Sequence, residues 1–503
     1  MRTISLSRRQ FHERARQGNL IPVFRQLLGD VHTPISIFLK FNGDRRPNSF
    51  LLESVINGER LGRHSFIGVE ARAILRGRDG RFELHRRDGD AGDAYTRTES
   101  YDGEPLEFIR NQFRNLNPVP DARLPAFYGG AVGFLAYDVI RYYEKLPDEN
   151  PDTADQEDAY FILADELAVV DHIERHIQLI VNIRTDDFKD PDAAYDFALR
   201  RLDAMEAGLH NQGGEEREIK RIKGKMPIAS NMSATEYKDM VVRARDYIYA
   251  GDIFQVVLSK RYSFRPEVDN FQVYRALRSI NPSPYMYFLN LGPYTIVGSS
   301  PEILVQCQQD RVVVRPIAGT RPRGRTPEAD LELERDLLAD TKEIAEHIML
   351  VDLGRNDLGR VCEPGTVRVT DFKTIERYSH VMHIVSNCEG ALKTGMHPYD
   401  ALRSAMPAGT VSGAPKIRAM EIIDELENVR RGIYAGCIGY FNYNGDFDTC
   451  ISIRTMIMQD GICHLQAGAG IVFDSVPDKE CEEVANKVRG MLKAVRFARR
   501  GLT

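Results

Sequence analysis

The sequence predicts a mixed α/β or α+β fold with large sheets, and three observations support this prediction. Runs rich in branched and aromatic residues, typical of strands, recur along the chain between segments with the spacing of amphipathic helices. A length of 503 residues allows an extensive core and more than one lobe. With 43% hydrophobic and 28% charged residues, the composition is that of a globular protein rather than a disordered or membrane protein.

The first part of the chain combines strand-like runs with polar loops. The segments 48–56 and 176–183 have the composition of strands. The polar, turn-rich stretch 77–104 between them predicts a hairpin and an exposed loop. At 209–230 the composition shifts to Gly, Glu, Lys and Arg, which indicates a linker. We therefore predict an N-terminal domain over 1–225 and a second domain over 226–503.

The second part opens with a helix signal. Ser233 and Glu236 have the spacing of a capping box, and apolar residues follow at helical spacing. Further on, the patterns predict strands over 253–258, 285–289, 295–299, 381–386 and 433–443, one long helix over 330–352, and a last helix after Pro477.

Charge and cysteine content limit the classes of function. The chain has 67 Lys and Arg against 73 Asp and Glu, a net charge of −6, which argues against a sequence-blind grip on nucleic acid. No apolar run approaches the ~20 residues needed to span a membrane, and the N-terminus does not resemble a signal peptide. The seven cysteines include no C-x-x-C pair and fit a reducing compartment. We expect a cytoplasmic protein that binds neither membranes nor nucleic acid.

Two predicted helices carry pairs of glutamates. Glu343 and Glu346 lie on one face of the helix over 330–352. In the last helix, Glu480 points into the apolar stripe, Glu483 lies at its edge, and Glu482 points away. A carboxylate directed at a core is costly unless it is paired or holds a cation, and Mg²⁺ takes one or two protein carboxylates together with water. The two pairs could converge on one Mg²⁺, or they could be solvated and paired with nearby Lys and Arg.

Three further features concern anion binding and proton transfer. The small residues Gly468, Ala469 and Gly470 allow backbone N–H groups to approach an anion, although the dinucleotide fingerprint is incomplete. Arg454 lies in the β-like run ISIRT, where it could face a carboxylate or form a sheet-edge ion pair. His383 shares a strand face with valines and could be a hydrogen-bonded core residue. The residues alone thus indicate a cytoplasmic enzyme for a small carboxylate, with Mg²⁺ as its candidate cofactor.

Ordered motifs cover nearly the whole chain. They are LLES at 51–54, HSFIG at 64–68, PSPYMYF at 282–288, GSSPE at 298–302, PIAGTRPRG at 316–324, EIAEHIMLVDLGRNDLGRV at 343–361, MHIVS at 382–386, AGTVSGAPK at 408–416, CISIRT at 450–455, AGAGIV at 467–472 and KECEEVANK at 479–487. With them the chain resembles the chorismate-utilising enzymes, most closely the large subunits (component I) of anthranilate synthases. The resemblance implies an α/β (α+β) fold of large antiparallel sheets flanked by helices, with an N-terminal regulatory lobe.

The resemblance also implies roles for single residues. Glu346 and Glu483 would hold Mg²⁺ directly, with Glu343 and Glu480 as outer partners, and the ion would grip the ring carboxylate of chorismate. Contacts to chorismate are implied for Gly319, Thr320, Tyr434, Arg454 and Lys487, and for a loop formed by Gly468, Ala469 and Gly470. Glu302 resembles the general acid that protonates the leaving 4-hydroxyl. His383 resembles the histidine associated with loss of pyruvate.

Two departures from related families indicate the nucleophile. Isochorismate and salicylate synthases carry a water-activating lysine where this chain has Gln255, and aminodeoxychorismate synthases carry a nucleophilic lysine where it has Ala318. Water needs an activating base, whereas free ammonia does not. The expected reaction is amination of chorismate at ring carbon 2 and loss of pyruvate, which gives anthranilate, the first committed step of tryptophan biosynthesis.

The resemblance also implies partners. The sequence carries no appended glutaminase segment, so ammonia would come from a separate glutaminase subunit (component II). L-Tryptophan would inhibit by binding a pocket that includes Ser54, Pro284, Tyr285 and Met286, although LLES and PSPYM are also consistent with an ordinary strand and turn. Two other functions stay open: an enzyme that stops at aminodeoxyisochorismate, and a tryptophan-binding regulatory subunit without catalysis.

Overall fold

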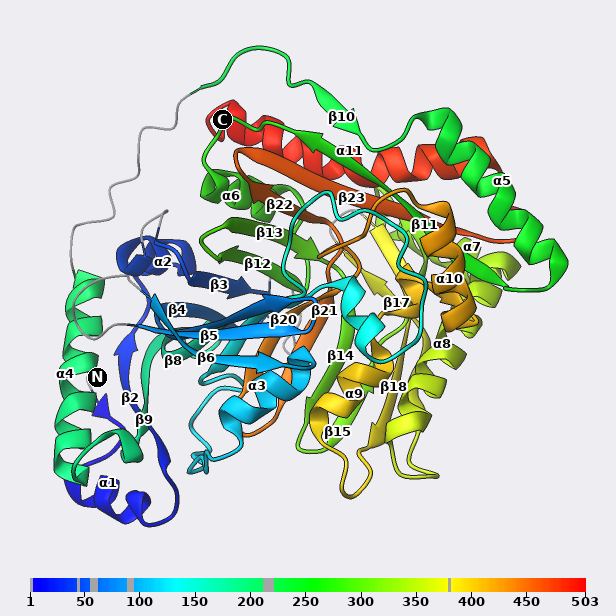
Figure 1. Ribbon diagram of the computed structural model, residues 1–503. Helices are drawn as coiled ribbons and strands as arrows, with labels where there is room; N and C mark the ends of the chain where they lie inside the picture. Colours follow the sequence, from blue (N-terminus) through cyan, green and yellow to red (C-terminus); the bar gives the residue numbers. More distant parts are fainter. Residues whose placement is uncertain (1–2, 43–45, 55–61, 88–94, 211–220, 379–380) are drawn as a thin grey trace.

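The computed structural model describes residues 3–42, 46–54, 62–87, 95–210, 221–378 and 381–503, and its strands form one connected network (Figure 1). The helices are α1 (Arg8–Ala15), α2 (Pro34–Asn42), α3 (Pro105–Phe113), α4 (Pro191–His210), α5 (Ala234–Ala250), α6 (Asn270–Ile280), α7 (Pro327–Ala339), α8 (Thr341–Val361), α9 (Pro398–Ala405), α10 (Lys416–Leu426) and α11 (Pro477–Arg499), with 3-10 helices η1 (Tyr137–Tyr142), η2 (Thr185–Asp187) and η3 (Gly409–Val411).

The strands alternate with these helices, as the sequence predicts. They are β1 (Thr3–Ile4), β2 (Leu20–Leu28), β3 (Ser49–Glu53), β4 (His64–Arg78), β5 (Arg81–Arg87), β6 (Tyr95–Asp102), β7 (Gly130–Leu135), β8 (Ala159–Asp171), β9 (His176–Arg184), β10 (Ile228–Ser230), β11 (Gln255–Phe264), β12 (Tyr285–Asn290), β13 (Tyr294–Ser300), β14 (Ile303–Gln308), β15 (Arg311–Val314), β16 (Ile317–Pro322), β17 (Arg368–Arg377), β18 (Val381–Ala391), β19 (Gly413–Ala414), β20 (Cys437–Asn442), β21 (Phe447–Ile451), β22 (Thr455–Gln459) and β23 (Ile462–Ile471). The implied fold of large antiparallel sheets flanked by helices is confirmed.

Two strands from the first part of the chain, β4 and β8, join two arms of the network. They pair with each other, and the register between them shifts between Gly68 and Ala73, as at a β-bulge. The first arm runs from β4 through β3, β12, β13, β22 and β23 to β11. The second arm runs from β8 through β7, β20, β21, β14 and β15 to β18, which also pairs with β16 and β17. Strands of residues 1–225 therefore form part of both arms.

Helices pack on each arm. Along the top of Figure 1, α11 contacts α5, α6 and β23 of the first arm. Its predicted apolar stripe is buried, consisting of Val484, Val488, Met491, Leu492 and Val495. On the second arm, α8 packs against β15, β16 and β18. These two helices carry the two glutamate pairs, so the fold decides how closely the pairs approach.

The helix signals had different outcomes. The capping box is confirmed, because Ser233 Oγ accepts from Glu236 N while the Glu236 side chain accepts from the Ser233 backbone. The prediction of one helix over 330–352 is wrong. Two helices, α7 and α8, meet at Asp340, whose side chain accepts from the backbone N–H groups of Lys342 and Glu343 and so begins a new helix.

Other expectations concern the linker and the membrane. The predicted linker, 209–230, begins within the last turn of α4, and 211–220 lie outside the described residues. The boundary at 225/226 stays a prediction. In the described parts of the chain, none of the helices combines the length and apolar character that a membrane span requires.

Candidate active site

A cavity of about 220 Å³ lies where the two arms and the helices α8 and α11 meet. The predicted site residues that line it are Gln255, Glu302, Ala318, Thr320, Glu346, His383, Tyr434, Arg454, Gly468, Gly470, Glu483 and Lys487. They come from β11, β16, β18 and β23, from α8 and α11, and from connections between strands. The structure thus brings together residues that are more than 200 positions apart in the sequence.

The glutamates of α8 and α11 act on one another electrostatically. Burial raises the pKa of Glu346, and the Glu483 carboxylate adds to this effect. Burial and the neighbouring Glu346 likewise raise the pKa of Glu343, while burial and Glu483 raise that of Glu480. Only Glu346 and Glu483 line the cavity, so Glu343 and Glu480 stand behind them. This order matches the implied inner and outer partners of a cation.

The donor set fits Mg²⁺. Within the described ranges, no group of three or more His, Cys, Asp or Glu side chains is arranged to hold a metal. Mg²⁺ needs only one or two carboxylates, because it keeps water and a ligand anion. Gln255 Nε2 donates to Glu346 Oε1 at 3.1 Å, and Gln255 Oε1 is a buried oxygen for which the described residues provide no hydrogen-bond partner. Two mutually repelling carboxylates and a spare amide oxygen would be stabilised by a cation.

Lys487 connects α11 with Gly468 of β23 at the wall of the cavity. Its Nζ lies 2.7 Å from Glu483 Oε1 and donates to the Gly468 carbonyl at 2.8 Å. Because Lys487 is one turn beyond Glu483 on the same helix, the pair has the usual i, i+4 spacing. The ammonium group therefore offsets part of the negative charge of the cluster.

Arg454 provides positive charge in the wall of the cavity. The prediction that it lies within a strand is wrong: it lies between β21 and β22 with φ 50°, and its backbone carbonyl accepts from Ser299 N at 3.1 Å. Along the described chain, no residue forms a hydrogen bond or ion pair with its guanidinium. Burial lowers the pKa of Arg454 while Glu302 raises it. A guanidinium without a partner in a cavity is suited to bind a carboxylate.

Glu302 is placed to act as a proton donor. It lies just beyond β13, and burial raises its pKa to about 7, against opposing effects of Thr410, Arg454 and Lys487. A carboxylic acid with a pKa near 7 retains its proton close to neutral pH, which is the property that a general acid requires.

His383 is oriented by its Nδ1 atom. Nδ1 lies 2.8 Å from the Gly319 carbonyl and 3.1 Å from Thr320 Oγ1. Because a carbonyl can only accept, Nδ1 carries the proton and Nε2 keeps its lone pair. Burial lowers the pKa of His383, so the ring is neutral at pH 7. His383 is thus hydrogen-bonded, as expected for a core histidine, and it also lines the cavity.

Gly319 and Ala469 are predicted site residues that do not line the cavity. Gly319 has φ 69°, and a Cβ there would stand 3.2 Å from Glu343 Oε2. Gly319 therefore lies beside Glu343, while its carbonyl contacts His383. Ala469 lies between the two cavity glycines of β23 and is fully buried.

The segment 468–470 is a strand rather than the implied loop. Gly468 and Gly470 pair with Ser259 and Val257 of β11. On its other side, β23 pairs with β22 only up to Leu465, so the edge beyond Leu465 faces the cavity. A Cβ on Gly470 would stand 2.6 Å from Gln255 Nε2. Glycine there allows the strand to pass close to the side chain that bonds Glu346.

The predicted tryptophan-pocket residues lie together, away from this cavity. Strand β3 pairs with β12 through Glu53 and Met286, which places Ser54 and Tyr285 at the next position of the ladder. Ser54 Oγ is buried without a hydrogen-bond partner in the described chain, and Tyr285 donates to Asp448 Oδ1 at 2.9 Å. Pro284 and Met286 are buried beside them. Whether these residues bind tryptophan stays a prediction.

Among the cavity-lining residues that were not predicted, two have polar side chains, Thr410 and Gln466. Thr410 lies in the motif AGTVSGAPK, and Gln466 directly precedes AGAGIV. Their positions beside quoted motifs were a usable signal. Their polar side chains alone gave no reason to prefer them over other Thr and Gln residues.

Comparisons with known proteins identify the family of this chain. The family described as chorismate binding enzyme matches residues 70–493. The anthranilate synthase component 1 of Acetivibrio thermocellus is 45% identical over 489 residues, covering 96% of this chain and 97% of that protein. The same component of Thermus thermophilus is 47% identical over 482 residues, covering 96% and 99%.

Solved structures share the fold. The anthranilate synthase component I of Streptococcus pneumoniae superposes with a TM-score of 0.76 at 35% identity, covering 92% of this chain and 98% of that chain. The menaquinone-specific isochorismate synthase of Escherichia coli has a TM-score of 0.69 at 18% identity, covering 96% and 97%, which is a likeness of fold alone. By family and by near-complete similarity, the chain belongs to the chorismate binding enzymes and, among them, to the anthranilate synthase component 1 family.

Proposed function

We propose that this chain converts chorismate and ammonia into anthranilate, pyruvate and water. The observation that carries the proposal is the composition of the cavity wall. The positions of the two lysines that would direct other chemistry are Gln255 and Ala318, and both line the cavity that contains Glu302 and Arg454. Without an activating base or an amine nucleophile at these positions, free ammonia is the nucleophile that the site favours.

In the first step, ammonia forms a bond to ring carbon 2, the ring double bonds shift, and the bond to the 4-hydroxyl breaks. Glu302 donates its proton to the departing oxygen, which leaves as water. Arg454 and the free edge of β23 hold the enolpyruvyl carboxylate, because the unpartnered guanidinium and the backbone N–H groups can bond its oxygens. The product of this step is aminodeoxyisochorismate.

In the second step, the proton on ring carbon 2 moves to a base while the enolpyruvyl ether bond breaks. His383 Nε2 is suited to take the proton, because Nδ1 is held by the Gly319 carbonyl. The ring becomes aromatic as anthranilate, and the released enol becomes pyruvate. Tyr434, which is buried, lines the same cavity as His383.

Mg²⁺ is the proposed cofactor, held by Glu346 and Glu483 with Glu343 and Glu480 behind them. When bound, it supplies positive charge that fixes the ring carboxylate and stabilises the negative charge that develops on the substrate. The support is the fit of the carboxylate pair and of Gln255 Oε1 described above.

Ammonia is proposed to come from a separate glutaminase subunit. The relatives' name, component 1, is consistent with a second component. L-Tryptophan is the proposed inhibitor, bound beside Ser54 and Met286. The support is that the buried Ser54 hydroxyl has no hydrogen-bond partner among the residues that the structure describes.

The test is a product analysis of the purified chain. With chorismate, MgCl₂ and ammonium chloride it should form anthranilate, detected by fluorescence, and an equal amount of pyruvate, whereas glutamine alone should give neither. Formation of isochorismate or aminodeoxychorismate would refute the proposal. Aminodeoxyisochorismate without pyruvate would instead identify an enzyme that stops after the first step.

A further inference from the structure

Behind the cavity wall lies a buried chain of polar side chains that the proposed chemistry does not use. We infer that Glu427 and Arg431 are positioning residues: their ion pair fixes the part of the wall formed by Val257, Val411 and Tyr434, and so sets the affinity for chorismate. The inference rests on the proposed function only for the identity of the substrate.

The pair is fully enclosed. The side chains of Glu427 and Arg431 are 2% and 1% exposed. Arg431 Nη2 lies 2.6 Å from Glu427 Oε1, and Nε donates to Oε2 at 3.0 Å. This bidentate arrangement fixes the plane of the guanidinium.

Arg431 also holds three separate segments of the cavity wall. Its Nη1 donates to the Val411 carbonyl at 2.6 Å, and Nη2 donates to the Val257 carbonyl at 2.7 Å. Its guanidinium carbon lies 5.7 Å from the centre of the Tyr434 ring. Val257, Val411 and Tyr434 all line the main cavity. One side chain therefore connects β11, η3 and the turn before β20 at the surface that faces the substrate.

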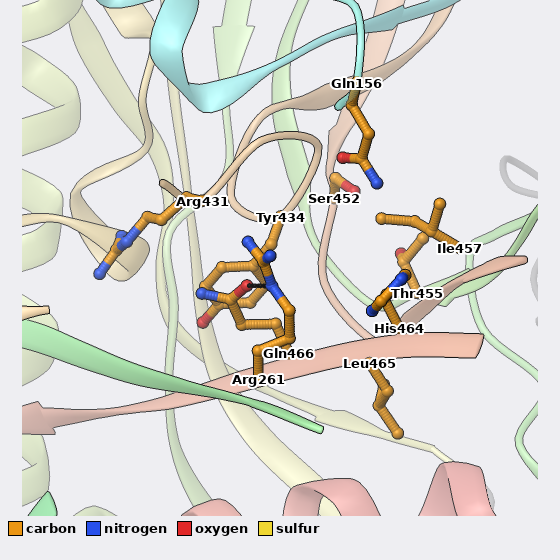
Figure 2. Close-up of a pocket in the computed structure, with 10 residues that line it drawn as sticks. All are labelled: Gln156, Arg261, Arg431, Tyr434, Ser452, Thr455, Ile457, His464, Leu465 and Gln466. Carbon is orange, nitrogen blue, oxygen red and sulfur yellow. Dashed lines mark hydrogen bonds between the residues drawn. The ribbon is translucent and has the colours of Figure 1, made fainter. Parts of the chain in front are cut away.

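Glu427 extends the contacts to β11 and β23. Its Oε1 accepts from both the backbone N and the Oγ of Ser259 at 2.8 Å. Gln466 Nε2 donates to Ser259 Oγ at 2.8 Å, and Arg261 Nε donates to Gln466 Oε1 at 3.1 Å. Figure 2 shows Arg261, Gln466, Tyr434 and Arg431 around a small cavity of about 10 Å³, which shares Tyr434 and Gln466 with the main cavity.

Such a network affects geometry more than stability. A buried ion pair often stabilises a fold no more than apolar residues of the same volume would. Its directional bonds to two carbonyls and a ring, however, leave these groups one arrangement, which is what a supporting shell provides to a binding site. Glu427, Arg431 and Ser259 do not line the main cavity, so their effect must act through the residues of the wall.

The test compares chorismate binding in four variants. Glu427→Gln and Arg431→Lys disrupt the pair, and Ser259→Ala removes one hydroxyl from the network. The matched control is Glu166→Gln, because Glu166 also receives two bonds from an arginine, Arg201, but lies on β8 outside the cavity. Chorismate affinity is measured by calorimetry with Mg²⁺ and without ammonia, and the KM values for chorismate and for ammonium are measured in turnover.

We expect Glu427→Gln and Arg431→Lys to weaken chorismate binding about tenfold or more and Ser259→Ala about threefold, since bonds involving charged groups are the stronger ones. The KM for ammonium should not change, and Glu166→Gln should bind chorismate like the wild type. A role limited to charge predicts the opposite for Glu427→Gln, because removing the carboxylate leaves more positive charge near an anionic substrate.

Folded variants that bind chorismate as tightly as the wild type, or more tightly, would overturn the inference. If Glu427→Gln and Arg431→Lys do not fold, Ser259→Ala decides by the same criterion. If the wild type binds chorismate but forms no anthranilate, the proposed function fails. The chorismate affinities of the variants relative to the wild type still test the positioning role of Glu427 and Arg431. If the wild type does not bind chorismate, both fail.

Discussion

The buried position of Glu302 predicts how kcat depends on pH. Its pKa is raised to about 7 because the carboxyl is buried, and the proposed role requires the protonated form. As pH rises through about 7 the acid loses its proton, so kcat should fall on the alkaline side. The measurement is kcat against pH at constant free ammonia, because ammonia is itself titrated in this range.

The matching substitution is Glu302→Gln, which keeps the shape and removes the proton. We expect kcat to fall by about 10²- to 10⁴-fold, the usual contribution of general acid catalysis. Chorismate binding should be retained. A variant that keeps the wild-type kcat and its alkaline decline would assign the proton to another group.

His383 tests the second step. In His383→Met the base at Nε2 is lost, and loss of pyruvate should slow by about 10²-fold or more. Because Glu302 is intact, chorismate should still be consumed and aminodeoxyisochorismate should accumulate, as chromatography of the quenched reaction would detect. Equal rates of chorismate loss and pyruvate release would exclude this role.

Some residues of the site could be predicted from the sequence and others could not. The two glutamate pairs were noticed because their members lie three apart on predicted helices, and the family resemblance then assigned Glu346 and Glu483 as the direct ligands. Arg454 was assigned to a strand because ISIRT has strand composition, whereas a positive φ at an arginine depends on tertiary contacts such as the bond from Ser299. Thr410 and Gln466 have no such pattern, and only the folded chain brings them to the cavity.

At the scale of elements, the break between α7 and α8 determines where the first glutamate pair begins. Asp340 caps α8, and Arg321 Nη2 lies 2.8 Å from its carboxylate. We expect Asp340→Ala to lower the free energy of unfolding by about 1 kcal/mol. It should also raise the Mg²⁺ concentration needed for half-maximal activity, because Glu343 is in the first turn.

The control for this substitution is Thr326→Ala. Thr326 caps α7 by accepting from Ala329 N, so its loss should also destabilise the fold. Because α7 carries none of the four glutamates of the proposed Mg²⁺ site, the dependence of activity on Mg²⁺ should stay as in the wild type. If both variants shift the Mg²⁺ dependence equally, the effect is general destabilisation.

The facing helices α8 and α11 allow a direct test of the cofactor. Glu346→Gln removes one of the two carboxylates that line the cavity and should abolish turnover at any accessible Mg²⁺ concentration. Glu343→Gln and Glu480→Gln should lower the affinity for Mg²⁺ by about 10- to 100-fold, as for outer partners of a metal site. Glu482→Gln, on the exposed side of α11, is the control and should have no effect. Unchanged kinetics of Glu346→Gln would remove it from the ligand set.

Elements were predicted best where their signals are local. The helix after Pro477 and the capping box at Ser233 depend on neighbouring residues, and both are confirmed. Strand β23 contains the glycine-rich segment that resembled a loop, because small residues weaken the strand signal while pairing with β11 maintains the strand. The prediction of a single helix over 330–352 failed because one aspartate within a helical pattern ends one helix and caps the next.

At the scale of the whole molecule, the pairing of β12 with both β3 and β13 connects the proposed tryptophan pocket with the active site. Tyr285 pairs with Ser300, two residues before Glu302, and Ser299 N donates to the Arg454 carbonyl. A shift of β12 would therefore reach both the acid and the guanidinium. This pairing gives the proposed inhibition a physical route.

The prediction is that Ser54→Leu weakens L-tryptophan binding at least tenfold, because the larger side chain would occupy space in the proposed pocket. The chain contains no tryptophan, so emission from the bound amino acid can be measured directly. The concentration for half-inhibition of ammonium-driven turnover should rise in parallel. Tight binding and full inhibition in this variant would place the pocket elsewhere.

The sequence predicted the class of architecture but not its connectivity. Strand pairing between distant segments, such as β7 with β20, leaves no periodic signal in either strand. The division at 225/226 was drawn from composition, which reports a linker but not whether strands on its two sides pair.

Strands β4 and β8 have a practical consequence for anyone who wishes to study either half alone. Cutting the chain in the linker would separate β12 and β20 from their partners β3 and β7, which leaves two unpaired strand edges on each fragment. Such fragments should aggregate when they are expressed separately, and they should be active only when they are co-expressed and associate.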